Sequence, residues 1–205
     1  MTGVPKRWNR ETATVPTEIE GFEDMTFLFD YRGGKTNGLI WMNHDEAACL
    51  WKWVGRIPPK TKIVEIGRAE GGSTVLIGSA RKDQGTKIVS IDLYPVDDEQ
   101  LTALLDELGL ENIEVIVADS QSFDAMSVGD VGLVFIDADH TYKGVKQDFE
   151  NWLPAVVSGG LVVFHDVREA GMQNYGPFEL YGELISDYRV KEVAAVGSVR
   201  VMRKQ

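Results

Sequence analysis

Cysteine is almost absent from this sequence. Cys49 is the only one among 205 residues, so no disulfide can form within the chain. A lone thiol suits a reducing compartment, and we expect a cytoplasmic protein. Residues 1–8 lack the apolar stretch of a signal peptide. No apolar run reaches the roughly 20 residues that a membrane span needs, so we expect no membrane partner.

Basic side chains are also in short supply. The 21 Lys and Arg residues are outnumbered by 32 Asp and Glu residues, which leaves a formal net charge of -11. Binding along a nucleic-acid backbone needs clustered basic side chains, so this balance argues against a nucleic-acid partner. The hydrophobic share of 43% is ordinary for a globular protein and can supply a core for a chain of single-domain length.

Two regions of different character follow one another along the chain. Residues 1–42 are irregular, and we expect them to form an amino-terminal arm or lid. The domain proper is expected to span residues 43–205. Its first helix begins at Asn43, because Glu46 stands three residues later as in a capping box. His44, at the start of this helix, is expected to be exposed.

From residue 62 onward, short apolar runs alternate with segments of helical spacing. The runs are continuously apolar, which is typical of parallel strands covered on both faces. The expected strands are residues 62–67, 86–92, 113–119, 131–137 and 159–166, and the expected helices between them are residues 72–82, 98–110 and 142–154. A final pair of strands, residues 190–196 and 199–204, flanks a two-residue turn. We therefore predict an α/β fold with a seven-stranded, mostly parallel sheet and a C-terminal antiparallel hairpin strand.

The loop after the first strand, "EIGRAEGGST", is rich in glycine. Its glycines allow a tight turn and a close approach of the backbone to a ligand. It matches neither G-x-G-x-x-G nor G-x-x-x-x-G-K-[ST], the motifs of dinucleotide and phosphate binding. Glu65 would repel a phosphate but suits a ligand with a positive centre or an amino group. A plain glycine-rich turn is the alternative.

Polar residues also follow the second and third strands. Asp92 stands where a carboxylate commonly binds both hydroxyls of a ribose. Asp119, Ser120 and Gln121 can form hydrogen bonds with an adenine edge, or they can cap the following helix. Together these residues point to a nucleoside ligand.

The fourth and fifth strands each end in acidic residues and histidine. The fourth leads into Asp137-Ala138-Asp139-His140, and the fifth ends in His165-Asp166. Asp139 or Thr141 can cap the helix that follows the fourth strand. His165 and Asp166 can form a hydrogen-bonded pair in which the imidazole acts as a base and no metal takes part.

Taken together, residues 42–165 resemble a class I S-adenosylmethionine-dependent methyltransferase with a Rossmann-like fold. The closest resemblance is to the metal-dependent catechol O-methyltransferase-like group and its bacterial small-molecule relatives. The segments "WMN" from Trp41, "SQ" from Ser120, "FIDADH" and "VVFHDV" carry it. The resemblance implies that S-adenosylmethionine is bound by Met42, Glu65, Gly67, Gly71, Gly72, Ser73, Asp92, Asp119, Ser120, Gln121 and Asp137.

The same resemblance implies how the reaction would work. Asp137, His165 and Asp166 would bind a divalent metal, Mg²⁺ or Mn²⁺, and His140 would be the catalytic base. The family pattern has a carboxylate or amide pair in place of His165-Asp166 and a Lys in place of His140. The expected reaction is O-methylation of a small-molecule hydroxyl on a phenol or catechol, a sugar or a natural-product intermediate.

Several alternatives stay open at this point. The enzyme can be a metal-independent methyltransferase with His140 or His165 as base. It can also be a non-catalytic module that binds a nucleoside cofactor. An NAD-dependent oxidoreductase is a further alternative, against which the missing G-x-G-x-x-G counts. An aromatic wall for the acceptor is expected from residues 167–184, and a homodimer is left open.

Overall fold

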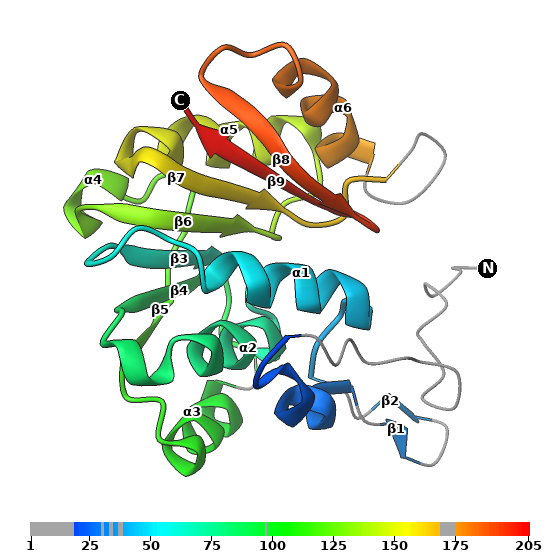
Figure 1. The fold of residues 1–205 in the computed structure, drawn as a ribbon, viewed down its shortest axis with the longest axis vertical. Helices are drawn as coiled ribbons and strands as arrows, with labels where there is room; N and C mark the ends of the chain where they lie inside the picture. The colour runs from blue at the N-terminus through cyan, green and yellow to red at the C-terminus, as the bar shows by residue number, and fades with distance from the viewer. Residues whose placement is uncertain (1–18, 30, 33–34, 37–38, 97, 169–174) are drawn as a thin grey trace.

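The computed structural model describes residues 19–29, 31–32, 35–36, 39–96, 98–168 and 175–205. A seven-stranded sheet in the order β5-β4-β3-β6-β7-β9-β8 runs through the molecule (Figure 1). Its strands are β3 (Lys62–Ile66), β4 (Ile88–Asp92), β5 (Ile113–Val117), β6 (Val131–Ile136), β7 (Val156–Phe164), β8 (Val190–Val196) and β9 (Val199–Lys204). The strands β3 to β7 are parallel, and β9 runs antiparallel to both of its neighbours. The predicted fold class and hairpin are confirmed.

Helices cover both faces of this sheet (Figure 1). One face packs against α1 (His44–Val54), α2 (Gly72–Ala80) and α3 (Asp98–Leu108), and the other against α4 (Ala125–Val128), α5 (Tyr142–Trp152) and α6 (Tyr175–Leu184). Short 3-10 helices are η1 (Phe22–Phe29), η2 (Lys82–Gln84) and η3 (Leu153–Ala155), and β1 (Tyr31–Arg32) pairs with β2 (Lys35–Thr36).

Successive side chains of the central strands enter opposite halves of the core. In β6, Leu133 and Phe135 lie in the cluster with α1 and α2, whereas Val134 and Ile136 lie in the cluster with α5. All four are buried, which explains why the sequence of this strand is continuously apolar. Burial of each such side chain contributes about 1.5–3 kcal/mol, so both helical layers are held firmly to the sheet.

The start of α1 agrees with the capping box but not with the expected exposure of His44. The Asn43 side chain accepts from the Glu46 N–H, and Glu46 accepts from the Asn43 N–H. The prediction for His44 was wrong, because its side chain is buried and its ring lies 4.2 Å from that of Phe29. The cause is η1, which packs across α1 and covers its first turn.

Part of the predicted amino-terminal arm, including residues 1–18, lies outside the described residues. In the described part, η1 buries Phe22, Met25 and Leu28 in the core cluster of α1 and α2. The boundary at residue 42 stays a prediction. Among the described helices, none combines the length and the apolarity that a membrane crossing requires.

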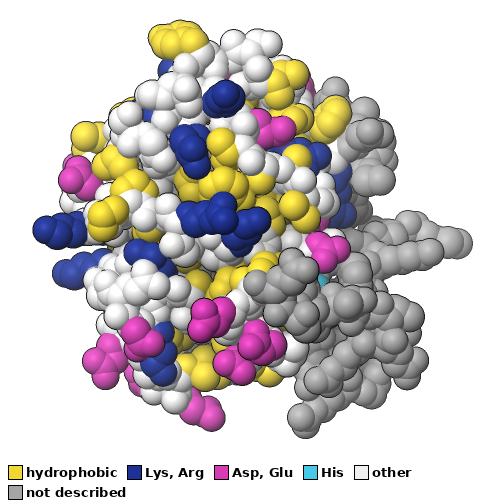
Figure 2. Space-filling view, viewed as in Figure 1, with side chains coloured by type: hydrophobic (Ala, Val, Ile, Leu, Met, Phe, Trp, Pro, Cys, Tyr) yellow, Lys and Arg dark blue, Asp and Glu magenta, His cyan; other side chains and the backbone are white. Residues whose placement is uncertain are grey.

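Charge is unevenly distributed on the face shown in Figure 2. Acidic side chains gather low in the view, where Figure 1 places α3, and Lys and Arg lie higher up among hydrophobic side chains. The first turn of α3 carries two acidic residues, Asp98 and Glu99.

Candidate active site

The carboxyl ends of the parallel strands bring the predicted site residues to one edge of the sheet. Ile66 of β3 pairs with Ile91 of β4 and Ile136 of β6, and Ile136 pairs with Phe164 of β7. The residues directly after these four positions therefore begin at the same level. They are Gly67, Asp92, Asp137 and His165. Ligands of open parallel sheets bind beyond this edge.

The glycine-rich loop, residues 67–72, is wedged between two other segments. Gly67 has φ +85°, and a Cβ there would collide with the carbonyl oxygen of Asp137. A Cβ at Gly72 would collide with the backbone of Leu39. Both glycines are required by close approach, and this contact brings the amino-terminal segment and the β6–α5 loop beside the same loop.

The segment before α1 is tied to the glycine-rich loop by side chains as well. The exposed Trp41 donates its indole N–H to Glu70 Oε2 at 2.6 Å. Met42, expected to contact the cofactor, is 8% exposed and belongs to the core cluster under α1. The segment thus lies across the start of α2, where a methionine end of a cofactor is expected.

Asp92 holds the backbone of the glycine-rich loop. Its Oδ2 accepts from the N–H groups of Arg68 at 2.9 Å and Ala69 at 3.1 Å, and its Oδ1 accepts from Tyr94 N–H at 3.2 Å. A carboxylate offers about four lone-pair sites, so capacity for a ribose hydroxyl remains. Asp92, which is predicted to bind the ribose, therefore also fixes the conformation of the glycine-rich loop.

Arg68 is a buried cation that the sequence did not single out. Its guanidinium makes two hydrogen bonds with Asp98, at 2.9 and 2.6 Å, and one with the carbonyl oxygen of Ile116 at 2.8 Å. These contacts connect the glycine-rich loop with the start of α3 and the end of β5. Arg68 therefore holds the glycine-rich loop in place against β5 and α3.

Glu65 lies below the loop and is fully buried. Its Oε2 accepts from Thr74 Oγ1 at 2.5 Å and Ser90 Oγ at 2.6 Å, whereas its Oε1 has no hydrogen-bond partner among the described residues. Burial raises the pKa of Glu65, against the opposing effect of the nearby hydroxyl groups of Ser73, Ser90 and Thr74. The unpaired Oε1 is the atom with which Glu65 could accept a hydrogen bond from a ligand.

Gly71 and Ser73 flank the first residue of α2. Gly71 is the N-cap at φ +85°, and a Cβ there would come within 2.5 Å of the Leu101 side chain. Ser73 is buried, with 7% of its surface exposed. The backbone N–H groups at this helix start are available to an electron-rich group of a ligand.

The three residues after β5 share one loop but differ in their side-chain contacts. Asp119 Oδ1 accepts from Gln121 N–H at 3.0 Å, which closes a tight turn. Ser120 Oγ donates to the buried Asp148 at 2.7 Å, so the predicted adenine contact of this hydroxyl competes with a structural one. Gln121 Nε2 lies 3.4 Å from Asp139 Oδ2. Asp119 and Gln121 keep surface exposure, so the predicted adenine contacts of these two residues stay open.

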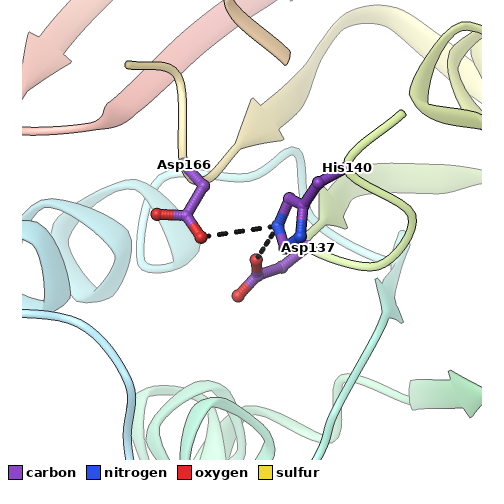
Figure 3. Close-up of side chains that lie close together, drawn as sticks. All are labelled: Asp137, His140 and Asp166. Carbon is purple, nitrogen blue, oxygen red and sulfur yellow. Dashed lines mark ion pairs between the residues drawn. The ribbon is translucent and has the colours of Figure 1, made fainter. Parts of the chain in front are cut away.

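Asp137, His140 and Asp166 converge from the ends of β6 and β7 (Figure 3). His140 Nε2 lies 3.5 Å from Asp137 Oδ1 and 3.4 Å from Asp166 Oδ2. Burial lowers the pKa of His140, but the hydrogen bond and charge of Asp137 and the charge of Asp166 outweigh it and raise this pKa above 6.5. Asp166 has φ +55°, a backbone conformation that is costly outside glycine and concentrates at functional sites.

His165 lies on the core side of this cluster, between two carboxylates. Its Nδ1 is 3.2 Å from Asp137 Oδ2 and its Nε2 is 3.6 Å from Glu46 Oε2. Burial opposes the charge on His165, yet Asp137, Glu46 and Asp166 raise its pKa to about 10. Burial likewise opposes ionisation of Glu46 and Asp137, but the neighbouring histidines lower both pKa values to about 2.

The group that could hold a metal differs from the set that the sequence suggested. Among the described residues it consists of Asp137, His140 and Asp166, whose ligand atoms lie within 4.8 Å of one another. His165, expected as a ligand, is outside this group because its ring nitrogens face Glu46 and Asp137. Two carboxylates and an imidazole are donors that suit Mn²⁺, Fe²⁺ or Zn²⁺, so the residues fit a divalent cation.

Arg168 adds a permanent positive charge at the rim. Its Nη2 lies 2.6 Å from Asp166 Oδ1. The carboxylates Glu46, Asp137 and Asp166 thus face positive partners within the protein itself. The site has its charges largely balanced before any ligand arrives.

The helix after β6 is capped by Thr141, one of the two residues expected for that role. The Thr141 side chain accepts from Gly144 N–H at 3.0 Å. Asp139 stands before the cap, and its Oδ1 accepts from Thr141 N–H at 2.8 Å. Both residues shape the turn that presents His140.

The expected aromatic wall lies only partly within the described residues, because residues 169–174 are outside them. The first turn of α6 touches the β6–α5 loop: a Cβ at Gly176 would collide with the carbonyl oxygen of His140. Phe178 and Tyr181 pack against the core, and Tyr181 donates to Glu192 at 2.6 Å. These two aromatic residues brace α6.

The sequence model of a family described as a methyltransferase domain matches residues 64–167. The uncharacterized protein y4gI of Sinorhizobium fredii is 37% identical over 67 residues. That stretch covers 32% of this chain and only 7% of y4gI.

Solved structures show the same fold. A Staphylococcus aureus protein provisionally described as a caffeoyl-CoA O-methyltransferase has a TM-score of 0.67 at 16% identity, over 82% of this chain and 87% of that chain. The Podospora anserina methyltransferase PaMTH1, bound to S-adenosylhomocysteine, has a TM-score of 0.65 at 15% identity, over 80% of each chain. CalS11, a TDP-rhamnose 3'-O-methyltransferase, has a TM-score of 0.62 at 15% identity, over 93% of this chain and 96% of that chain. The family match covers half of the chain, and this chain therefore belongs to the family of methyltransferase domains.

Proposed function

We propose that this methyltransferase transfers the methyl group of S-adenosylmethionine to a hydroxyl oxygen of a small molecule. The observation that carries the proposal is the convergence of Asp137, His140 and Asp166 beside the glycine-rich loop. A base held between two carboxylates at this position suits activation of a hydroxyl group.

The donor would lie along the edge formed by β3, β4 and β5. Asp92 would accept from the ribose hydroxyls, and Asp119 and Gln121 would border the adenine. Glu65 Oε1 and the start of α2 would receive the methionine end. Asp137 would stand near the sulfonium, whose positive charge a carboxylate stabilises. These placements align the methyl group with the cluster of Asp137, His140 and Asp166 for in-line attack.

His140 would accept the proton of the acceptor hydroxyl on its imidazole ring. Asp137 and Asp166 orient the ring and stabilise the imidazolium that forms, as their distances of 3.5 and 3.4 Å support. Because these carboxylates raise the pKa of His140, its neutral, proton-accepting form becomes more abundant as the pH rises above 6.5. Turnover should therefore rise with pH through that range.

A divalent cation is the second element of the proposal. Asp137 and Asp166 would hold it; His140 belongs to the same group, but while it serves as the base its lone pair cannot also bind the cation. When bound, such a cation lowers the pKa of the hydroxyl that it contacts. Metal-free transfer with His140 as base is the second candidate. It is favoured because Arg168 already pairs with Asp166 and His165 with Asp137, so these carboxylates have positive partners without a cation. Turnover with EDTA, then with Mn²⁺ restored, separates the two.

For the acceptor, we propose a small hydroxylated molecule, either a phenol or catechol or a sugar or natural-product intermediate. The similarity to CalS11, which methylates a sugar hydroxyl, supports the second class, and the resemblance to catechol O-methyltransferase supports the first. The cytoplasm is the proposed compartment, since the sequence contains a single cysteine and can form no internal disulfide.

The test begins with calorimetry of S-adenosylhomocysteine binding. Labelled S-adenosylmethionine is then incubated with catechol and with hydroxylated sugars, and products are analysed for methyl ethers. Binding and a methyl ether would support the proposal. Cofactor binding without transfer to any hydroxyl would leave the non-catalytic module, and absence of cofactor binding would reject both.

A further inference from the structure

Glu46 is a buried carboxylate with contacts in three directions. Its Oε1 accepts from Ser198 N–H at 2.7 Å and Ser198 Oγ at 2.8 Å. Its Oε2 accepts from Asn43 N–H at 3.0 Å and lies 3.6 Å from His165 Nε2. Only 4% of the residue is exposed. It thus joins the start of α1, the β8–β9 turn and the end of β7.

Helix capping alone does not require such burial. A capping-box Glu needs one oxygen near the N-cap N–H, and a glutamine would serve as well. Taking an ionised carboxylate out of water is unfavourable unless charged or hydrogen-bonding partners offset it. Here the neighbour that calls for a charge is His165, whose side chain is 2% exposed.

The contact continues from His165 to the reacting residues. His165 Nδ1 lies 3.2 Å from Asp137 Oδ2, and Asp137 Oδ1 lies 3.5 Å from His140 Nε2. One oxygen of Asp137 is therefore committed to the core side, and the other is turned toward His140, as Figure 3 shows. A carboxylate held on one side in this way has little freedom to rotate.

Glu46 is itself held in place from the β8–β9 turn. Gly197 in that turn has φ +54°, and a Cβ there would come within 2.5 Å of Glu46 Oε1. Together with the two hydrogen bonds from Ser198, this close packing leaves Oε2 pointing to His165. The side chain is fixed at both oxygens.

We propose that Glu46 is a positioning residue for methyl transfer: it holds His165, His165 holds Asp137 Oδ2, and Asp137 Oδ1 is thereby kept toward His140. The inference rests on the proposed function for the role of His140. It assigns His165, which replaces a family metal ligand, to an internal support of Asp137. The path joins Glu46 to His140 through two intervening side chains.

The test uses ring signals of histidine in the full-length protein with S-adenosylhomocysteine bound. The chain has only three histidines, so ¹H–¹⁵N spectra of the rings can be assigned by single substitutions. In Glu46→Gln, the ring signals of His165 and His140 should both move, while affinity for S-adenosylhomocysteine stays within about twofold of wild type. Ser198→Ala is the matched control: it removes one bond to the same carboxylate but keeps the contact with His165, and should move neither ring.

A second comparison shows whether Glu46 acts on His140 through His165 or through a general loss of packing around the site. In a His165→Gln background, adding Glu46→Gln should move the His140 signals no further. Turnover of catechol by Glu46→Gln should fall about 10- to 100-fold, the usual range for a residue that supports a reacting group. His140 signals unmoved in Glu46→Gln, or moved equally in both backgrounds, would overturn the inference. If wild type methylates no hydroxyl, the proposed function fails, but the ring signals still decide what Glu46 holds.

Discussion

Asp148 of α5 offers a sharp test of the electrostatics beneath the loop that follows β5. Its side chain is fully buried, and its Oδ1 accepts from Ser120 Oγ at 2.7 Å. Its Oδ2 has no hydrogen-bond partner among the described residues, and Asp139 and Asp119 add negative charge nearby. Burial, helped by these two carboxylates and opposed by Ser120, raises the pKa of Asp148 from 3.8 to about 6.

The sign of the effect follows from proton binding. Because the folded pKa is the higher one, the native state retains this proton at pH values where the unfolded chain has lost it. Stability therefore falls as the pH rises from 4 past 6 and then levels off. A rise from 3.8 to about 6 is roughly two pKa units, or about 3 kcal/mol at most.

Asp148→Asn removes this penalty and keeps an oxygen that can accept from Ser120. We expect the free energy of unfolding to match wild type near pH 3, below the unfolded pKa, and to exceed it by about 1–3 kcal/mol at pH 8. Urea unfolding followed by tryptophan fluorescence at several pH values measures the difference. Asp106→Asn, at an exposed site on α3, controls for the change in net charge. A variant less stable than wild type at pH 8, or a difference that does not vary with pH, would refute the reasoning.

Three further outcomes are expected at the site itself. Asp92→Ala should weaken S-adenosylhomocysteine binding by about 1–3 kcal/mol in calorimetry, because acceptors for two loop N–H groups and for the ribose are lost; unchanged affinity would remove Asp92 from the cofactor site. Asp166→Ala should abolish any stimulation of turnover by Mn²⁺ while cofactor affinity is kept, and a variant still stimulated would argue against this ligand. His140→Gln should lower turnover at saturating substrate by about 10²- to 10⁴-fold, and a rate near wild type would exclude it as the base.

The strands of the sheet and the C-terminal hairpin were within reach of the sequence because the signals for them are local. A continuous apolar run such as residues 131–136 indicates a strand that is buried on both faces. The two-residue turn Gly197-Ser198 between two apolar runs indicates a hairpin. The capping box at Asn43 is likewise a pattern of four residues. Each of these depends on neighbours along the chain, so no knowledge of tertiary contacts is needed.

The candidate site was only partly predictable, since several of its residues act through contacts distant in sequence. Arg68 reads as an ordinary loop residue until its bonds to Asp98 and Ile116 are seen. Glu46 satisfies the capping box, and that local role conceals its contact with His165. The error at His44 has the same origin, because the segment that buries it, η1, showed no clear periodicity.

The placement of His165 shows what strand alternation could have added to the comparison of motifs. Phe164 lies in the core cluster of α5 and α6, and Val163 in that of α1 and α2. Side chains alternate along a strand, so the next residue, His165, points toward the layer of α1. There it lies beside Glu46. Asp166, the next residue, has a φ of +55° and lies on the side of His140. Alignment of the family motif by position alone therefore assigns metal binding to both His165 and Asp166. In the structure the two side chains lie on opposite sides of Asp137.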